Sequence, residues 1–221
     1  MFDSNKTWFC KQLRTEDAKQ IGEQLNIAIS EADHSEATKL FQKVKKYMKI
    51  RINENYFLPL KNIHTCLAKL DIPENTAFIT MGINCILIEL FYEMKNGYDE
   101  SREGGTVGNA YKEILPLLDP TISEDLAILF YKGIRCGILH QGQTKNNTAL
   151  TYQLDTIIQP NGPYYLCNPQ TLFEKLKNLY SLYWEDISEK NYSDELAINL
   201  IQKYNYILTH ISYFNNYSRW I

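Results

Sequence analysis

Hydrophobic residues recur at helical spacing along most of the chain. From Thr15, which is followed by two acidic residues, this spacing predicts a helix that is broken or bent near Asp33 and reaches about Met48. The next segment carries two prolines, which predicts a turn and then a short helix around 61–70. Helical periodicity over so much of the sequence favours an all-α fold.

The segment from Ala77 to Met94 is apolar on nearly all sides. Such a helix is buried, either at the centre of a bundle or in a membrane. A membrane span needs about 20 predominantly apolar residues, and a carboxylate at its centre costs about 2.5 kcal/mol or more. This segment carries four polar side chains, namely Thr80, Asn84, Glu89 and Glu93. We therefore expect a core helix that ends at Gly97, and no membrane span.

The second half of the chain predicts shorter elements. An amphipathic helix is expected over 109–118, and Ser123 with the acids after it is typical of the start of another helix, which Gly142 ends. Between 148 and 167 polar and apolar residues alternate around the turn sequence PNGP, which predicts a small β-hairpin. Two amphipathic helices rich in aromatic residues are expected over 169–221.

These elements predict a single helical domain over 1–221 with the hairpin inserted into a helical bundle. A length of 221 residues with 44% hydrophobic content suits one domain with a substantial core. The five cysteines are scattered without a C-x-x-C pair, which argues against a disulfide framework and a structural zinc site. The first residues show no secretory signal. We expect a cytoplasmic protein without a metal or another cofactor.

The formal charge of -3 provides no overall attraction to nucleic acid, so any RNA contact must come from a local patch. Basic residues cluster once, in KLFQKVKKYMKIR, where one helical face carries Lys39, Lys43 and Lys46. This face is a candidate contact for an RNA backbone, and the alternative is a solvated helix surface. Arg102, in the polar loop DESREGG, is a further candidate phosphate contact with the same alternative.

The sequence RCGILH places Arg135 and His140 late in the helix that begins near Ser123. On a helical wheel they lie about 140° apart, on either side of a mostly apolar arc opposite the core face. That arc is formed by Ile128, Leu129, Lys132, Cys136 and Leu139. A surface helix of a monomer should not expose such an arc, so we expect it to contact another segment or a second copy of the chain.

The two side chains suit attack on a phosphodiester. Histidine gives and takes protons near neutral pH, while arginine presents a permanently charged fork to phosphate oxygens. RNA carries its own nucleophile, the 2′-hydroxyl, so this chemistry requires no metal. Two copies of the chain facing each other across a two-fold axis would supply two residues of each kind.

At Arg135 and His140 the chain resembles the HEPN family of all-α domains, whose signature is R-x(4–6)-H. The resemblance covers about 73–143 and implies a HEPN-like helical bundle in which paired motifs meet at a dimer interface. Many members of that family are metal-independent ribonucleases, often toxins or antiviral effectors. The resemblance implies a homodimeric endoribonuclease acting on single-stranded RNA, with His140 as general acid or base and Arg135 as phosphate stabiliser. Its partner could be a neutralising antitoxin or a regulatory protein.

Three further residues are candidates for supporting the pair. Glu89 and Asn84 are polar positions in the core helix, and Glu89 either orients Arg135 or His140 or forms an ordinary buried ion pair. Cys136 stands where active members often carry a polar residue. The alternative function is therefore a catalytically inactive module that binds a nucleotide or a protein partner. In a third interpretation, Arg135 and His140 only cap the carbonyls at the end of their helix.

Overall fold

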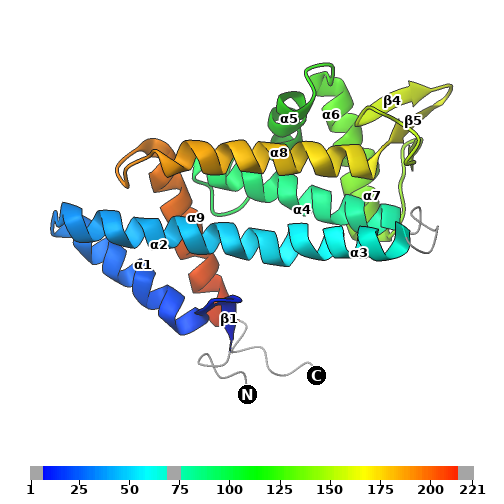
Figure 1. Cartoon of the computed structure of the whole chain (residues 1–221). Coiled ribbons are helices and arrows are strands. Elements are labelled where there is room, and N and C mark those ends of the chain that lie inside the picture. Colours follow the sequence, from blue (N-terminus) through cyan, green and yellow to red (C-terminus); the bar gives the residue numbers. More distant parts are fainter. Residues whose placement is uncertain (1–6, 69–75, 214–221) are drawn as a thin grey trace. The chain divides into compact units, whose positions relative to one another are not determined.

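The computed structural model describes residues 7–68 and 76–213, and most of this chain is helical, as predicted (Figure 1). The end of the predicted C-terminal segment, 214–221, lies outside the described residues. Internal contacts divide the described chain into two compact units. Unit 1 comprises 7–55, 94–99 and 184–213, and unit 2 comprises 56–68, 76–93 and 100–183. The prediction of one domain did not include this division.

In unit 1, three of the described helices pack together with a pair of short strands. These elements are β1 (Trp8–Cys10), β2 (Leu13–Arg14), α1 (Thr15–Ser30), α2 (His34–Ile52) and α9 (Glu195–Tyr213). The predicted break near Asp33 is confirmed, because its side chain caps α2 by accepting the N–H of Glu36 at 3.0 Å. In the core, the buried Tyr204 donates a hydrogen bond to the carbonyl of Ala18 at 2.8 Å.

The turn predicted before 61–70 is absent. A π-helical turn, η2 (Asn53–Phe57), follows α2 directly and leads into α3 (Leu58–Ala68). The turn lies just before Pro59, whose ring nitrogen cannot donate to a preceding carbonyl, and a widened helical turn is a common adjustment at such a point. The prolines therefore modify the helix at this point without ending it.

Helix α4 (Ala77–Asn96) is the predicted core helix. It is the one described helix that is long and apolar enough to cross a membrane, but 56% of its most apolar window is buried inside the protein. Tyr180 of α8 (Pro169–Ser188) packs on it: its hydroxyl donates to the Leu87 carbonyl at 2.9 Å and its ring meets that of Phe91 edge-on at 5.1 Å. The helix ends just before Gly97, as predicted.

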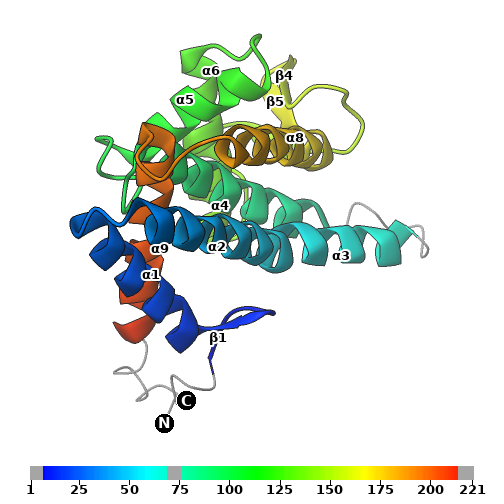
Figure 2. The same ribbon diagram turned by 60° about the vertical axis from the view of Figure 1, so that its left-hand side comes forward.

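The predicted helices around the R-x(4)-H sequence are present in unit 2. Helix α5 (Val107–Leu118) packs against α6 (Glu124–Phe130), as Figure 2 shows, and the Ser123 hydroxyl caps α6 by accepting the N–H of Leu126 at 3.3 Å. A π-helical turn, η4 (Tyr131–Arg135), then leads into α7 (Cys136–Gln141). Gly142 ends α7 with φ of 67°, a left-handed conformation that glycine adopts easily.

The predicted hairpin is part of a larger sheet. Strands β4 (Ile158–Asn161) and β5 (Tyr164–Cys167) form the antiparallel hairpin, but β3 (Thr148–Leu150) pairs in parallel with β5, so the order is β3-β5-β4. The alternating residues after Leu150 do not continue as a strand. The carbonyl of Leu154 instead accepts hydrogen bonds from the side chains of Asn168 and Thr171, which tie this segment to the start of α8.

The loop after α7 folds back onto the helix through a close contact at glycine. The carbonyl of Gly133 accepts the N–H of Lys145 at 3.0 Å. A Cβ atom on Gly137 would collide with the carbonyl oxygen of Gln143 and lie 3.2 Å from the Cα of Thr144. Since both neighbours are backbone atoms, they cannot move aside as a flexible side chain could.

We expect Gly137→Ala to lower the free energy of unfolding by about 2 kcal/mol, because overpacking against backbone forces a shift of the loop. Urea denaturation followed by circular dichroism measures the loss. Gly82→Ala is the matched control, since a Cβ there would have its nearest neighbour, the Cγ2 of Ile138, at an ordinary 3.8 Å. The control should be neutral or stabilising by up to about 1 kcal/mol. Equal stability of the two variants would contradict the close contact.

Candidate active site

Arg135 and His140 lie on either side of a change in helical geometry. Arg135 is the last residue of the π-helical turn, in which the N–H of Cys136 bonds to the carbonyl of Tyr131, five residues earlier. His140 lies in the last turn of α7 and is exposed. Single π-helical turns inside α-helices occur frequently at functional sites.

Arg135 binds Glu89 of α4 through a two-point ion pair. Its Nε donates to Oε1 at 2.8 Å and its Nη2 donates to Oε2 at 3.2 Å, and the two side chains are only 16% and 17% exposed. Burial lowers the pKa of Arg135, but the hydrogen bond and the charge of Glu89 outweigh this effect and raise it above the usual value. The structure thus brings together Arg135 and a carboxylate that holds its guanidinium in one orientation.

Tyr111 of α5 holds the carboxylate in turn. Its hydroxyl donates to Oε1 of Glu89 at 2.9 Å and lies 3.3 Å from the carbonyl oxygen of Cys85. Because Tyr111 is fully buried, its pKa is raised well above the usual value, so the phenol keeps its proton as a donor. The sequence did not identify Tyr111. Its position in the amphipathic helix predicts only that it faces the core, and gives no indication of the residue that it contacts. The general need of a buried phenol for a hydrogen-bond partner is the only signal available.

His140 extends this network to the surface. The Nη1 of Arg135 lies 3.1 Å from the Nε2 of His140. A guanidinium has no acceptor, so Nε2 must accept, and the imidazole in this contact is neutral with its proton on Nδ1. The expectation that the two side chains stand apart across an apolar arc was therefore wrong. An angle on a helical wheel describes where side chains leave the helix, and two long side chains can still meet at their ends.

The other two supporting candidates have different roles. Cys136 is half-buried beside Tyr131, and burial together with the hydrogen bond to Cys136 raises the pKa of the Tyr131 phenol. The Tyr131 ring lies 5.9 Å from the guanidinium carbon of Arg135. Asn84 is buried and donates to the carbonyl of Pro169 at 2.8 Å, which fixes the start of α8 to α4. None of the contacts that the structure describes connects Asn84 with Arg135 or His140.

The basic candidates do not belong to this network. Three of them, Lys39, Lys43 and Lys46, lie on α2 in unit 1, whereas Arg135 and His140 lie in unit 2. Lys39 pairs with Glu36 at 3.0 Å on the helix surface, an exposed pair of little energetic value. Arg102 is exposed in the loop between α4 and α5. No group of three or more potential metal ligands is found among the described residues.

Comparison of the chain with protein-family models, with curated proteins and with solved structures gives no match. The resemblance to the HEPN family therefore depends on Arg135, His140 and their helical context alone.

The geometry combines a fixed positive charge with a neutral base at the surface of unit 2. A guanidinium has five N–H groups, and Glu89 and His140 take three of those of Arg135. The remaining two can donate to the oxygens of an anion such as phosphate. The imidazole of His140 can accept a proton at Nε2 from a hydroxyl group beside that anion.

Proposed function

We propose that the protein is a metal-independent endoribonuclease of HEPN type that cleaves single-stranded RNA. The observation that carries this proposal is the 3.1 Å contact between Nη1 of Arg135 and Nε2 of the exposed His140. The ion pair between Arg135 and Glu89 also supports the proposal. It holds the guanidinium in one orientation, and a group that stabilises charge in an active site must be positioned in advance.

The proposed reaction uses the 2′-hydroxyl of the substrate as the nucleophile. A phosphate binds the remaining N–H groups of Arg135 while Glu89 keeps the guanidinium in place. The exposed imidazole turns away from Nη1, so that Nε2 of His140 can accept the 2′-hydroxyl proton. The 2′-oxygen attacks phosphorus, the bond from phosphorus to the 5′-oxygen breaks, and that oxygen takes a proton from a second imidazole, which enters the reaction in its protonated form. The products are a 2′,3′-cyclic phosphate and a 5′-hydroxyl end. Arg135 stabilises the charge that develops on the phosphate oxygens.

A second copy of the chain would supply the second imidazole. Apolar side chains are exposed on α4, the helix of Glu89, and on α7, the helix of His140, namely Ile79 (52%), Ile86 (40%) and Leu139 (41%). The two helices adjoin where Gly82 of α4 faces Ile138 of α7. Exposed apolar residues gathered on adjoining helices favour an interface with another protein surface. We therefore propose that this surface, Ile79, Ile86 and Leu139, joins two copies in a homodimer.

Ile86→Glu tests the dimer. A charge at the centre of an apolar interface should produce a monomer and reduce cleavage by about 100-fold, the usual contribution of one acid–base group. Light scattering gives the mass, and cleavage of labelled RNA gives the rate. Leu182→Glu is the control, because Leu182 is 62% exposed on α8, and it should leave both unchanged. Full activity of a monomeric Ile86→Glu protein would overturn the proposed interface.

The proposed activity is tested with purified protein and end-labelled single-stranded RNA in excess EDTA. Wild type should cleave, and Arg135→Ala, with its folding checked by circular dichroism, should not. Failure of a well-folded wild-type protein to cleave would contradict the proposal. The resemblance extends it to a cytoplasmic toxin or antiviral effector with a neutralising or regulatory partner. Expression in a bacterial host should then slow growth.

Two observations favour the alternative, a catalytically inactive module that binds a nucleotide. Glu89 already neutralises the charge of Arg135, and Cys136 stands where a polar helper is frequent in active HEPN members. Such a module should bind a mononucleotide through Arg135 without cleaving RNA. Equilibrium titration with nucleotides, beside the cleavage assay, distinguishes the two functions.

A further inference from the structure

Unit 2 contains a second polar site whose residues are distinct from Arg135 and His140. A cavity of about 610 Å³ is lined by α3, by the segment before the hairpin and by one face of α8. We call it the α8 pocket, and the side chains that matter here are His64, Tyr152, Asp155, Glu174, Lys175 and Asn178. Its volume lies in the range of small-molecule sites, roughly 300–1,000 Å³.

The walls of the α8 pocket are held by hydrogen bonds. The side-chain oxygen of Asn168 accepts the N–H groups of Gln170 at 2.8 Å and Thr171 at 3.2 Å, and its amide donates to the Leu154 carbonyl. The hydroxyl of Tyr152 lies 2.6 Å from that of Thr76. The pocket is therefore preformed. Because Asn168 already caps these N–H groups, the start of α8 is not left open to an anion.

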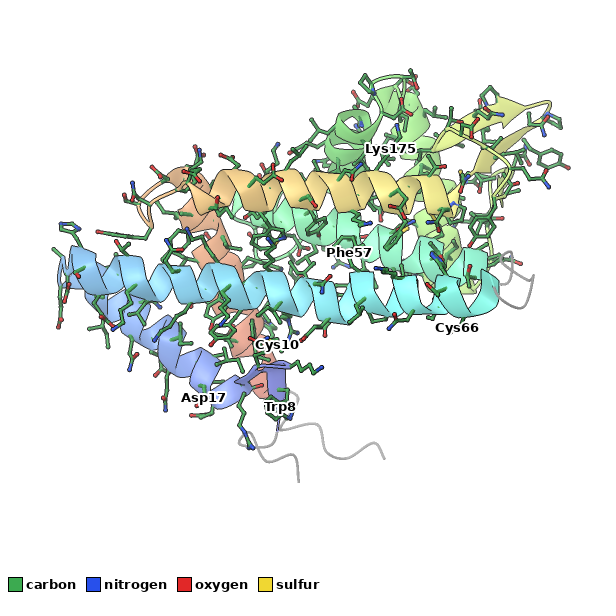
Figure 3. All side chains as sticks on the ribbon, in the orientation of Figure 1. Trp8, Cys10, Asp17, Phe57, Cys66 and Lys175 are labelled. Carbon is green, nitrogen blue, oxygen red and sulfur yellow. The ribbon has the colours of Figure 1, made fainter. Side chains whose placement is uncertain are left out.

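The charges in the α8 pocket are unsuited to phosphate. The one basic side chain among the lining residues, Lys175, points from α8 towards α5 and α6 (Figure 3), where it donates to the Leu118 carbonyl at 3.2 Å and to Asp119 at 3.3 Å. Its charge is thus already matched by a carboxylate. The carboxylates of Asp155 and Glu174 are exposed at the pocket. That of Glu174 already accepts a hydrogen bond from Gln170 at 3.0 Å and pairs with Lys177 at 3.5 Å, which leaves Asp155 as the acceptor for a ligand. A ligand that donates hydrogen bonds suits this arrangement better than one that brings negative charge.

His64 contributes an uncharged aromatic ring. Its Nε2 lies 2.8 Å from the hydroxyl of the buried Thr80, and its ring meets that of Phe173 edge-on at 5.8 Å. Burial lowers the pKa of His64, while the negative charge of Glu174 acts in the opposite direction with a smaller effect. The ring is therefore neutral at neutral pH. With Tyr152, it gives the pocket two flat surfaces suited to a planar ligand.

We propose that the α8 pocket binds a guanine base. The N1–H and the 2-amino group of guanine are adjacent donors, which match the two oxygens of the Asp155 carboxylate. The 6-carbonyl oxygen can accept from the amide of Asn178, and the ring can stack on His64 or Tyr152. Adenine and uracil do not present two adjacent donors on one edge. This site goes beyond the proposed ribonuclease activity and does not depend on it.

The test is calorimetric titration of the His140→Ala protein. This variant lacks the proposed catalytic imidazole, so RNA ligands stay intact during the titration even if the wild type cleaves RNA. Guanosine should bind at least about tenfold more tightly than adenosine, cytidine or uridine, which corresponds to one good hydrogen-bonded contact. Asp155→Asn should abolish this preference. Glu185→Gln, an exposed position further along α8, should keep it.

Two sources of the base are distinguished by comparing guanosine with an oligouridine that carries one guanine. Tight binding of guanosine indicates a free nucleoside or nucleotide, whereas binding of the oligonucleotide alone indicates a base of an RNA chain. Equal binding of all four nucleosides, or no preference for guanine in either ligand, would overturn the proposal. Competition by spermidine at equal affinity would also overturn it in favour of an organic cation.

Discussion

His140→Ala is expected to reduce RNA cleavage by about 100-fold or more, because it removes the group that accepts the 2′-hydroxyl proton. The free energy of unfolding should change by less than about 0.5 kcal/mol, since the imidazole is exposed and the contact that the structure describes for it is one hydrogen bond from Arg135. Cleavage rates on labelled RNA and urea denaturation measure the two effects.

Gln141→Ala is the matched control for this variant, because Gln141 is the exposed neighbour at the end of the same helix. It should cleave as wild type does. Cleavage by His140→Ala at the wild-type rate would remove His140 from the mechanism. A large loss of stability in His140→Ala would show instead that the pair mainly caps the helix end.

Glu89→Gln is expected to lower the free energy of unfolding by about 3 kcal/mol, because it leaves the guanidinium of Arg135 buried without its counter-charge. Glutamine keeps the shape of the side chain, so the loss of stability measures the effect of removing the negative charge. Cleavage should fall as well, since the guanidinium is no longer held by two hydrogen bonds. Denaturation and cleavage assays on the same preparation measure both effects.

Glu124→Gln provides the comparison, because Glu124 forms an ion pair with Lys112 in which the two side chains are 70% and 36% exposed. That change should cost less than about 1 kcal/mol. Adding Arg135→Met to Glu89→Gln should recover stability without activity, as expected when both charges of a buried pair are removed. Wild-type stability of Glu89→Gln alone would show that Arg135 does not depend on this carboxylate.

Local signals in the sequence predicted much of the fold. The helix break near Asp33, the cap at Ser123, the end of α4 before Gly97 and the hairpin turn each depend on a few neighbouring residues, and all are present. The parallel pairing of β3 with β5 was missed because it joins distant segments. The two π-helical turns were missed because they leave the hydrophobic pattern of a helix almost unchanged.

The site could be predicted only in part for the same reason. The cost of a buried carboxylate indicated that Glu89 needs a partner, and the structure provides Arg135. The same reasoning predicts that Asn84 needs a partner but does not predict which one. In the structure its amide donates to the carbonyl of Pro169. Tyr111 reaches Glu89 from another helix, so its role depends on tertiary packing that no spacing in the sequence reveals.

The most direct test of the central claim is the chemistry of the RNA ends that purified wild-type protein releases in excess EDTA, determined by mass spectrometry. Attack by the 2′-hydroxyl, with Arg135 and His140 in the roles proposed, predicts a 2′,3′-cyclic phosphate on one fragment and a 5′-hydroxyl on the other. A 3′-hydroxyl with a 5′-phosphate would contradict this mechanism. Intact RNA after incubation with the folded protein would contradict the ribonuclease function itself.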